Sequence, residues 1–267
     1  MQPTADAGPV FRLHRGHLPL LVSVPHDGTA LPDAIATRLT ASARRVPDTD
    51  WHIARLYDFV RAMGTSLIVP QYSRYVIDLN RGEDDVSLYP GQNTTGLCPR
   101  VQFDGQPVYL AGFEPDAAEV SERVGTYWRP YHAALRDELQ RLKSAHGRVL
   151  LWEGHSIRGE LPFLFDGRLP DLNLGTAGGT SCTPHTQARI EAVLDAQSAY
   201  SHVVNGRFKG GHITRHYGRP DDGVEAVQLE ISQRCYMDED SVEWNAVAAE
   251  RLQTLLTRLL EAALSPG

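Results

Sequence analysis

Several short apolar runs along this chain stop abruptly, and two of them stop at or near a histidine. Leu20–Val24 is followed by Pro25 and His26, and Leu150–Trp152 is followed, after Glu153 and Gly154, by His155. A short apolar run beside a proline or a glycine is typical of a buried strand. We therefore predict two strands that each present a histidine at the carboxyl end.

Further segments have the composition of strands. They are rich in β-branched residues and bounded by turn residues, and they comprise Ser66–Pro70, Tyr75–Leu79, Val203-Val204 and Ala226–Ile231. Between them, apolar positions at helical spacing predict helices over residues 31–41, 50–63, 115–144 and 186–197. Pro130 is expected to kink the third of these helices. Asp240 and Glu243 have the spacing of a capping box for a final amphipathic helix.

Strands that alternate with helices predict an α/β fold, in which a mostly parallel sheet lies between two layers of helices. The sequence contains no internal repeat, so we treat residues 1–267 as a single domain. Ligands of open α/β sheets bind at the carboxyl ends of the strands. The two strand-end histidines are therefore expected to share one site, and two histidines with acidic residues nearby suggest a metal.

Composition excludes several classes of function. The net charge is −7 and the sequence pI is about 5.9, so the chain has no broad basic field for nucleic acid. The first eight residues lack the basic and apolar regions of a signal peptide, and no apolar run has the length of a membrane helix. The three cysteines lack metal-knuckle spacing and do not suggest a disulfide framework. We expect a cytoplasmic protein that acts on a small molecule.

His26 and His155 are the candidate metal ligands. Hydrolytic zinc sites commonly use three His or carboxylate ligands and leave a position for water. Asp48 and Asp50, at the start of a predicted helix, are candidates for the third ligand. An aspartate there is often a helix cap, and a single buried histidine is more often a hydrogen-bonded core residue. We favour Asp50 as the ligand and Asp48 as a cap or a supporting residue.

Glu230 interrupts an otherwise apolar strand. Strand alternation puts it on the same face as Gln228 and Ser232, opposite Leu229 and Ile231. A carboxylate at the end of a sheet can act as a general base toward an attacking water. The alternative is a strand residue that simply faces solvent.

Arginines at both ends of one segment suggest an acidic substrate. Arg74 precedes the predicted strand Tyr75–Leu79, and Asn80-Arg81 follow it. Guanidinium groups match carboxylates with paired donors, although surface ion pairs would need the same residues. A glycine-rich run from Asn205 to Gly218 contributes Arg207 as another cation. The long Gly-, Asn- and Pro-rich stretch over residues 82–112 is expected to be functional or mobile.

With these motifs in order, the chain resembles the N-formylglutamate amidohydrolases of bacterial histidine degradation. The resemblance runs from about residue 20 to residue 236 and is carried by seven segments: 23–26, 48–52, 73–81, 154–157, 161–179, 210–214 and 228–231. It implies a zinc-dependent hydrolase on the α/β/α scaffold of the zinc exopeptidases, also described as phosphorylase/hydrolase-like. Such an enzyme releases formate and L-glutamate from N-formyl-L-glutamate.

The resemblance also assigns roles. It implies zinc, or another divalent metal, on His26, Asp50 and His155, with Glu230 as the base. Asn80 and Arg81 would hold a substrate carboxylate. From the residues themselves we further expect Arg74 to stabilise the oxyanion, and Arg207 and Thr214 to contact the substrate. The family usually has aspartate where this chain has Glu153, so the longer side chain puts metal affinity in question.

Two competing functions remain open. One is a zinc deacylase or carboxypeptidase-like hydrolase that acts on a larger acyl amino acid. The other is a protein that binds acidic amino acids without catalysis, which would need the arginines but no base. The identity of the metal, the acyl specificity and the oligomeric state stay undetermined at this point.

Overall fold

The computed structural model describes residues 9–86 and 95–265. The first eight residues, which were not expected to form a signal peptide, lie outside that range, as does part of the stretch 82–112. The strands are β1 (Phe11–His14), β2 (Leu20–Ser23), β3 (Ser66–Pro70), β4 (Val149–Ile157), β5 (Leu172–Gly175), β6 (His202–Val204) and β7 (Val224–Ser232). The α-helices are α1 (Asp33–Ala36), α2 (Ile53–Leu56), α3 (Ala117–Arg123), α4 (Arg129–His146), α5 (Pro184–Asp195), α6 (His212–Tyr217) and α7 (Ala246–Leu264).

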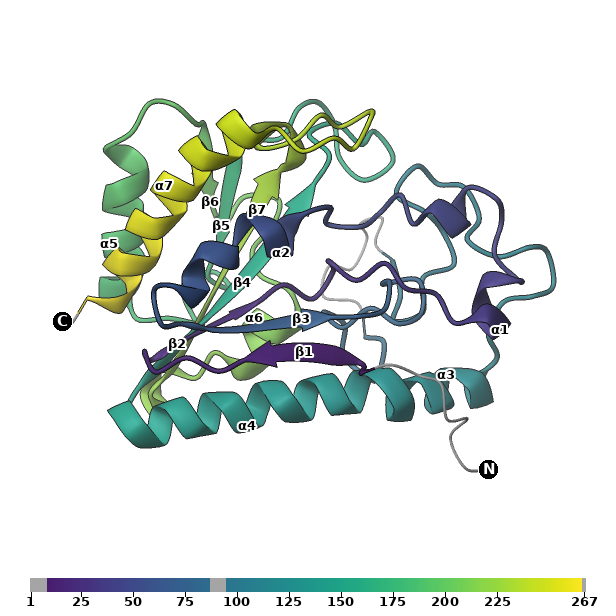
Figure 1. Ribbon diagram of the computed structural model, residues 1–267, viewed down its shortest axis with the longest axis horizontal. Helices are drawn as coiled ribbons and strands as arrows, with labels where there is room; N and C mark the ends of the chain where they lie inside the picture. Colours follow the sequence, from purple (N-terminus) through teal and green to yellow (C-terminus); the bar gives the residue numbers. More distant parts are fainter. Residues whose placement is uncertain (1–8, 87–94, 266–267) are drawn as a thin grey trace.

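The strands form a seven-stranded sheet in the order β1-β3-β2-β4-β7-β5-β6. The pairs β2-β3, β2-β4, β4-β7 and β5-β6 are parallel, whereas β1-β3 and β5-β7 are antiparallel. Helices α3 and α4 run along one face, and α5 and α7 lie on the other (Figure 1). The predicted three-layer α/β/α fold with a mostly parallel sheet is therefore confirmed.

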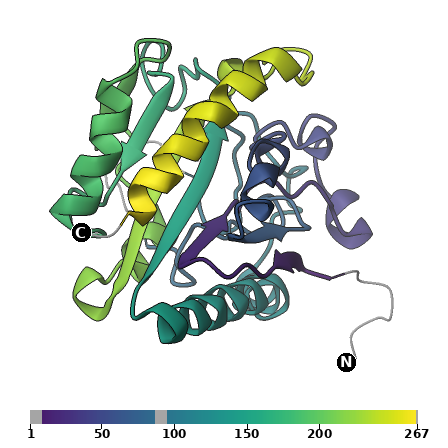
Figure 2. The same cartoon turned by 60° about the vertical axis from the view of Figure 1, so that its left-hand side comes forward.

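The central strands are apolar on both faces because helices cover both. Along β2, Leu20 and Val22 contact one core and Leu21 contacts the other. The first core is completed by the leucines of α7 and by α5, which pack side by side over the sheet (Figure 2). The second core includes Leu135 and Leu142 of α4. A strand buried on both faces reads as a continuous apolar run, which is why β2 and β4 could be found in the sequence.

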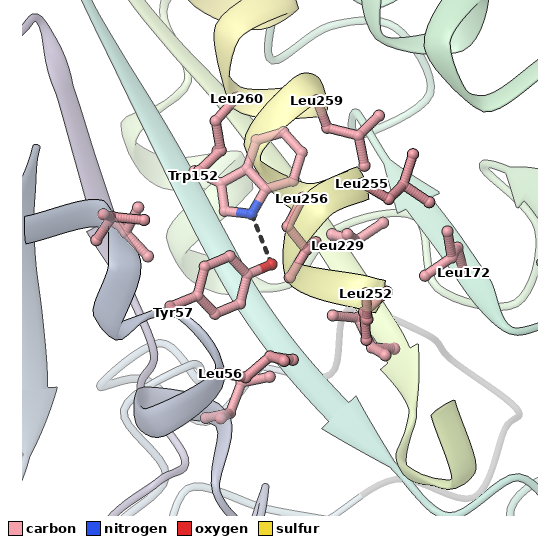
Figure 3. Close-up of a cluster of buried hydrophobic side chains, with 14 of the residues drawn as sticks. Leu56, Tyr57, Trp152, Leu172, Leu229, Leu252, Leu255, Leu256, Leu259 and Leu260 are labelled. Carbon is pink, nitrogen blue, oxygen red and sulfur yellow. Dashed lines mark hydrogen bonds between the residues drawn. The ribbon is translucent and has the colours of Figure 1, made fainter. Parts of the chain in front are cut away.

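Trp152 of β4 lies at the centre of the first core, between Tyr57 and the leucines of α7 (Figure 3). Its indole nitrogen donates to the Tyr57 hydroxyl at 2.9 Å, so the polar atoms of both rings are satisfied inside the core. The Tyr57 ring also explains why residue 154 is a glycine. A Cβ at Gly154 would lie 2.6 Å from the Tyr57 ring, so only glycine fits between Glu153 and His155 at this point.

Two of the predicted elements were wrong. Tyr75–Leu79 is not a strand but a series of turns, because local bonds such as Tyr75 N to Ser73 Oγ (3.2 Å) and Asn80 N to Asp78 Oδ1 (2.9 Å) replace strand pairing. The helix expected over residues 50–63 is split into α2 and a 3-10 turn, Asp58–Arg61.

The helix ends also differ from expectation. Asn245, rather than Asp240, caps α7 by accepting from Ala248 N at 3.0 Å. A π-helical turn, Val124–Trp128, separates α3 from α4, and Pro130 lies in the first turn of α4; the expected kink at Pro130 stays a prediction. Strands β1 and β5 and helix α6 were not predicted. No helix in the described ranges combines the length and the apolarity that a membrane span requires.

Candidate metal centre and substrate pocket

The two histidines meet at the carboxyl edge of neighbouring parallel strands. His26 follows β2 by three residues, and His155 lies near the end of β4. Both side chains are buried, and their ring centroids are 4.9 Å apart. The prediction that both histidines share one site is therefore in accord with the geometry.

Asp50 completes a group of three. Its Oδ2 lies 3.1 Å from Nδ1 of His155 and 3.8 Å from Nδ1 of His26. Ligand atoms from the three residues all lie within 4.8 Å of one another, and among the described residues this is the one group of His, Cys, Asp and Glu that could hold a metal. Two imidazoles and one carboxylate form the donor set of many catalytic zinc sites, so the residues fit the implied metal.

The other nitrogen of each ring is held by a second carboxylate. Nε2 of His26 lies 2.7 Å from Oδ1 of Asp78, and Nε2 of His155 lies 2.8 Å from Oε1 of Glu153. A carboxylate on Nε2 holds a proton there and leaves the Nδ1 lone pair free for a metal. Both rings therefore present Nδ1 toward Asp50, because the carboxylate beside each Nε2 fixes the tautomer of that ring.

Charge shapes the ionisation of these groups. Burial, followed by the charge of Arg74, lowers the pKa of His26. Burial also acts to lower the pKa of His155, but Glu153 and Asp50 outweigh it and hold that pKa well above its usual value. A protonated His155 must lose its Nδ1 proton before it can bind a cation, so metal binding should release a proton.

Arg74 is anchored among the acidic residues of the site. It donates to Oδ2 of Asp78 at 2.8 Å, and its NH1 is 3.7 Å from Oδ1 of Asp50. Its guanidinium lies over the Phe103 ring, 4.8 Å from the centroid, and lines the pocket. The cation therefore balances the charge of two buried carboxylates, Asp78 and Asp50.

Glu230 lies opposite His155 in the register of β4 and β7 and lines the same pocket. Its carboxylate has no hydrogen-bond or ion-pair partner among residues 9–86 and 95–265, although the residue is only 7 % exposed. Burial, reinforced by the charge of Asp50, raises the pKa of Glu230 to about 8. A buried carboxyl without a partner, aimed into a cavity, can exchange protons with a bound molecule.

The pocket extends from the proposed metal ligands toward two arginine side chains. It is a cavity of about 120 Å³, and its wall includes Asn80, Arg81 and Arg207 together with an apolar side formed by Phe103, Ile157, Leu164 and Phe208. Arg81 has no hydrogen bond or ion pair from its guanidinium within the described part of the chain. Arg207 donates to the Leu164 carbonyl at 2.9 Å, which fixes it against the apolar side.

Thr214 and Asp48 are not among the residues that line the pocket. Thr214, expected to bind substrate, is fully buried and does not line the pocket; it donates to Oε2 of Glu153 from both its backbone nitrogen (3.1 Å) and its hydroxyl. Asp48 is outside the metal group, as favoured, and accepts from Tyr75 Oη at 2.6 Å and from Phe103 N at 2.9 Å. Asp48 thus supports the pocket wall.

Sequence reasoning missed several residues of the site, among them Asp78, Phe103 and Gln228. Asp78 was read as part of a strand, and Phe103 lies in a loop without a motif. Gln228, two residues before Glu230 on the same strand face, lines the pocket and accepts from Gly211 N at 2.7 Å. A polar residue two positions from Glu230 was the signal that could have identified Gln228.

The comparisons with known proteins agree with this site. The chain is 52% identical to an N-formylglutamate deformylase of Pseudomonas aeruginosa and 50% identical to one of Pseudomonas putida, over 97% of each protein. A solved N-formylglutamate amidohydrolase from Ralstonia eutropha JMP134 superimposes with a TM-score of 0.81 at 28% identity, covering 95% of this chain and 96% of that one. A gene product of Agrobacterium tumefaciens, at 18% identity and a TM-score of 0.68, shares the fold. Residues 18–237 match the sequence profile of N-formylglutamate amidohydrolase, and the chain therefore belongs to this family.

Proposed function

We propose that this protein hydrolyses the formyl amide of N-formyl-L-glutamate to formate and L-glutamate, with one divalent metal, zinc in the first instance, on His26, Asp50 and His155. The observation that carries the proposal is that Glu230 lines the same pocket as these three ligands and has no partner for its carboxylate within the described residues. A protein that only binds acidic amino acids needs cations but has no use for a buried, unpartnered carboxyl beside a metal site.

The residues divide the chemistry between them. A metal held here would polarise the formyl carbonyl and lower the pKa of water. Glu230 takes a proton from the attacking water and passes it to the leaving amine nitrogen, so the C–N bond breaks as neutral amine departs. Arg74 places positive charge where the carbonyl oxygen becomes negative, and its anchoring by Asp78 keeps it oriented before the reaction begins.

Substrate recognition falls to the other end of the pocket. N-formylglutamate has two carboxylates, and two arginines, Arg81 and Arg207, line the wall. We assign the α-carboxylate to Arg81 with Asn80, and the side-chain carboxylate to Arg207. The apolar side of the pocket suits the methylene groups between them.

The names of the Pseudomonas relatives support this substrate, and the family resemblance suggests a place in histidine degradation in the cytoplasm. The competing carboxypeptidase-like function would require a larger acyl group, and the substrate comparison below distinguishes the two.

The proposal is tested by following formate release from N-formylglutamate. The same assay is run with N-acetylglutamate and N-succinylglutamate by measuring glutamate release. The expected result is turnover of the formyl substrate, loss of activity after chelation, and recovery on adding zinc. Comparable turnover of the succinyl compound would favour the larger-acyl deacylase, and binding of formylglutamate without turnover would favour the binding protein.

A further inference from the structure

We propose that Thr214, in the first turn of α6, is a positioning residue that orients the metal ligand His155 through Glu153. The inference rests on the proposed metal site. It assigns to Thr214 a task different from the substrate contact expected at first, and it accounts for the glutamate at position 153.

Glu153 is fully buried and uses both of its carboxylate oxygens. Oε1 lies 2.8 Å from Nε2 of His155, and Oε2 accepts from the Thr214 backbone nitrogen at 3.1 Å and from the Thr214 hydroxyl. Glu153 and His155 are two residues apart on β4, so their side chains leave the same face of the sheet. The carboxylate therefore links the ligand to α6, which lies elsewhere in the chain.

A glutamate needs this second contact more than an aspartate would. The extra methylene gives the carboxylate another rotatable bond, and each free rotation weakens the control that it exerts on a neighbouring ring. Two donors from one residue fix Oε2, which leaves Oε1 with a single direction toward His155. The Thr214 contact thus answers the question of how the longer side chain can still hold a metal ligand.

Glycines let the first turn of α6 approach Glu153 this closely. Gly210 has φ +115°, a conformation that favours glycine, and a Cβ there would lie 2.9 Å from Cγ2 of Thr214. A Cβ at Gly211 would lie 2.3 Å from the side chain of Asn80. Gly211 N also donates to Gln228 Oε1 at 2.7 Å, which ties the turn to β7. These close approaches place Thr214 within hydrogen-bond distance of the Glu153 carboxylate.

Removing the Thr214 hydroxyl should therefore weaken the orientation of His155 while all three proposed metal ligands remain in place. Thr214→Val keeps the shape and the backbone donor but loses the hydroxyl donor. Loss of an outer partner of a ligating histidine typically lowers metal affinity about 10–100-fold. Thr214→Ser keeps the hydroxyl and should restore the affinity to near the wild-type value.

The experiment measures metal affinity directly. Zinc binding by the metal-free full-length protein is determined by competition with a chromophoric chelator for wild type, Thr214→Val and Thr214→Ser. The visible absorption of the Co²⁺-loaded proteins reports the geometry of the ligands. Thr186→Val is the matched control, because Thr186 is equally buried and hydrogen bonded but lies on α5, away from the pocket.

The expected result is weaker zinc binding and an altered Co²⁺ spectrum for Thr214→Val alone, with Thr214→Ser close to wild type. If Thr214→Val folds and binds zinc as tightly as wild type, or if Thr186→Val weakens binding equally, the positioning role is wrong. Failure of the proposed function has a different signature, because wild type would then bind no stoichiometric zinc or cobalt.

Discussion

Nε2 of His26 lies 2.7 Å from Oδ1 of Asp78, and this contact turns Nδ1 of the same ring toward Asp50. Asp78 also pairs with Arg74 through its other oxygen, at 2.8 Å. One buried carboxylate therefore orients a ligand of the proposed metal and the proposed oxyanion-binding cation together.

We predict that Asp78→Asn weakens zinc binding about 10–100-fold, because an amide holds the Nε2 proton less firmly than a carboxylate does. Arg74 loses its closest anion in the same variant, so kcat should fall even at saturating zinc. Competition with a chelator measures the affinity, and assays with excess zinc separate the two effects. Wild-type affinity in this variant would show that Asp78 serves only the fold.

Glu230→Gln is expected to lower kcat for N-formylglutamate by roughly 10²–10⁴-fold, the usual contribution of a positioned general base. The amide has nearly the same shape, and the metal ligands are untouched, so zinc content and KM should stay close to wild type. Steady-state kinetics with metal analysis of the same sample checks this. A near-normal kcat would assign Glu230 a structural role.

Arg81→Met should greatly reduce kcat/KM for N-formylglutamate. Leaving a desolvated carboxylate without its cation costs roughly 2–5 kcal/mol. The informative comparison is between formylglutamate and its α-amide analogue, because wild type should reject the amide and the variant should lose that preference. Arg136→Met, at an exposed pair with Asp137, is the control. Unchanged discrimination by Arg81→Met would transfer the role to Arg207.

The buried His132 should make the free energy of unfolding depend on pH. Its ring is buried and stacked on Trp128, and its nitrogens contact Leu79 O and Tyr217 Oη at 2.9 Å. Burial, and the charges of His212 and His216, lower its pKa to about 3, although the Leu79 contact raises it.

The unfolded chain takes up a proton at His132 below pH about 6.5, whereas the folded protein stays neutral there until near pH 3. Stability contributed by neutral His132 is therefore complete above pH 6.5 and falls as the pH is lowered, by about 2 kcal/mol at pH 5. Urea unfolding of wild type and His132→Gln between pH 5 and 8 tests this. The variant should be less stable at pH 8 and show a shallower decline, and parallel curves would contradict the assignment.

The central strands β2 and β4 could be predicted from the sequence because they are buried on both faces. β2 and the first half of β4 are continuous apolar runs, and polar residues that follow or interrupt the apolar positions of β4 and β7, among them His155, Gln228 and Glu230, line the pocket. A polar residue within an apolar strand segment could therefore be recognised from the sequence as a candidate site residue.

What could not be predicted depends on contacts between distant segments. Asp78 looked like a polar residue in a strand, and its role exists only because His26 lies 52 positions away in sequence and 2.7 Å away in space. Thr214 was expected to contact the substrate, and its hydrogen bonds to Glu153 could not be predicted, since nothing local indicates that α6 packs against Glu153. Turn-rich segments with long-range hydrogen bonds have no periodicity from which to infer such contacts.

The most direct test of the central claim is the metal content of protein purified without added metal and then loaded with one equivalent of zinc. Wild type should retain close to one zinc per chain after removal of free metal. His26→Ala and His155→Ala should each lose most of it, together with formate release from N-formylglutamate. Full zinc retention by either folded variant would contradict a shared site on His26, Asp50 and His155.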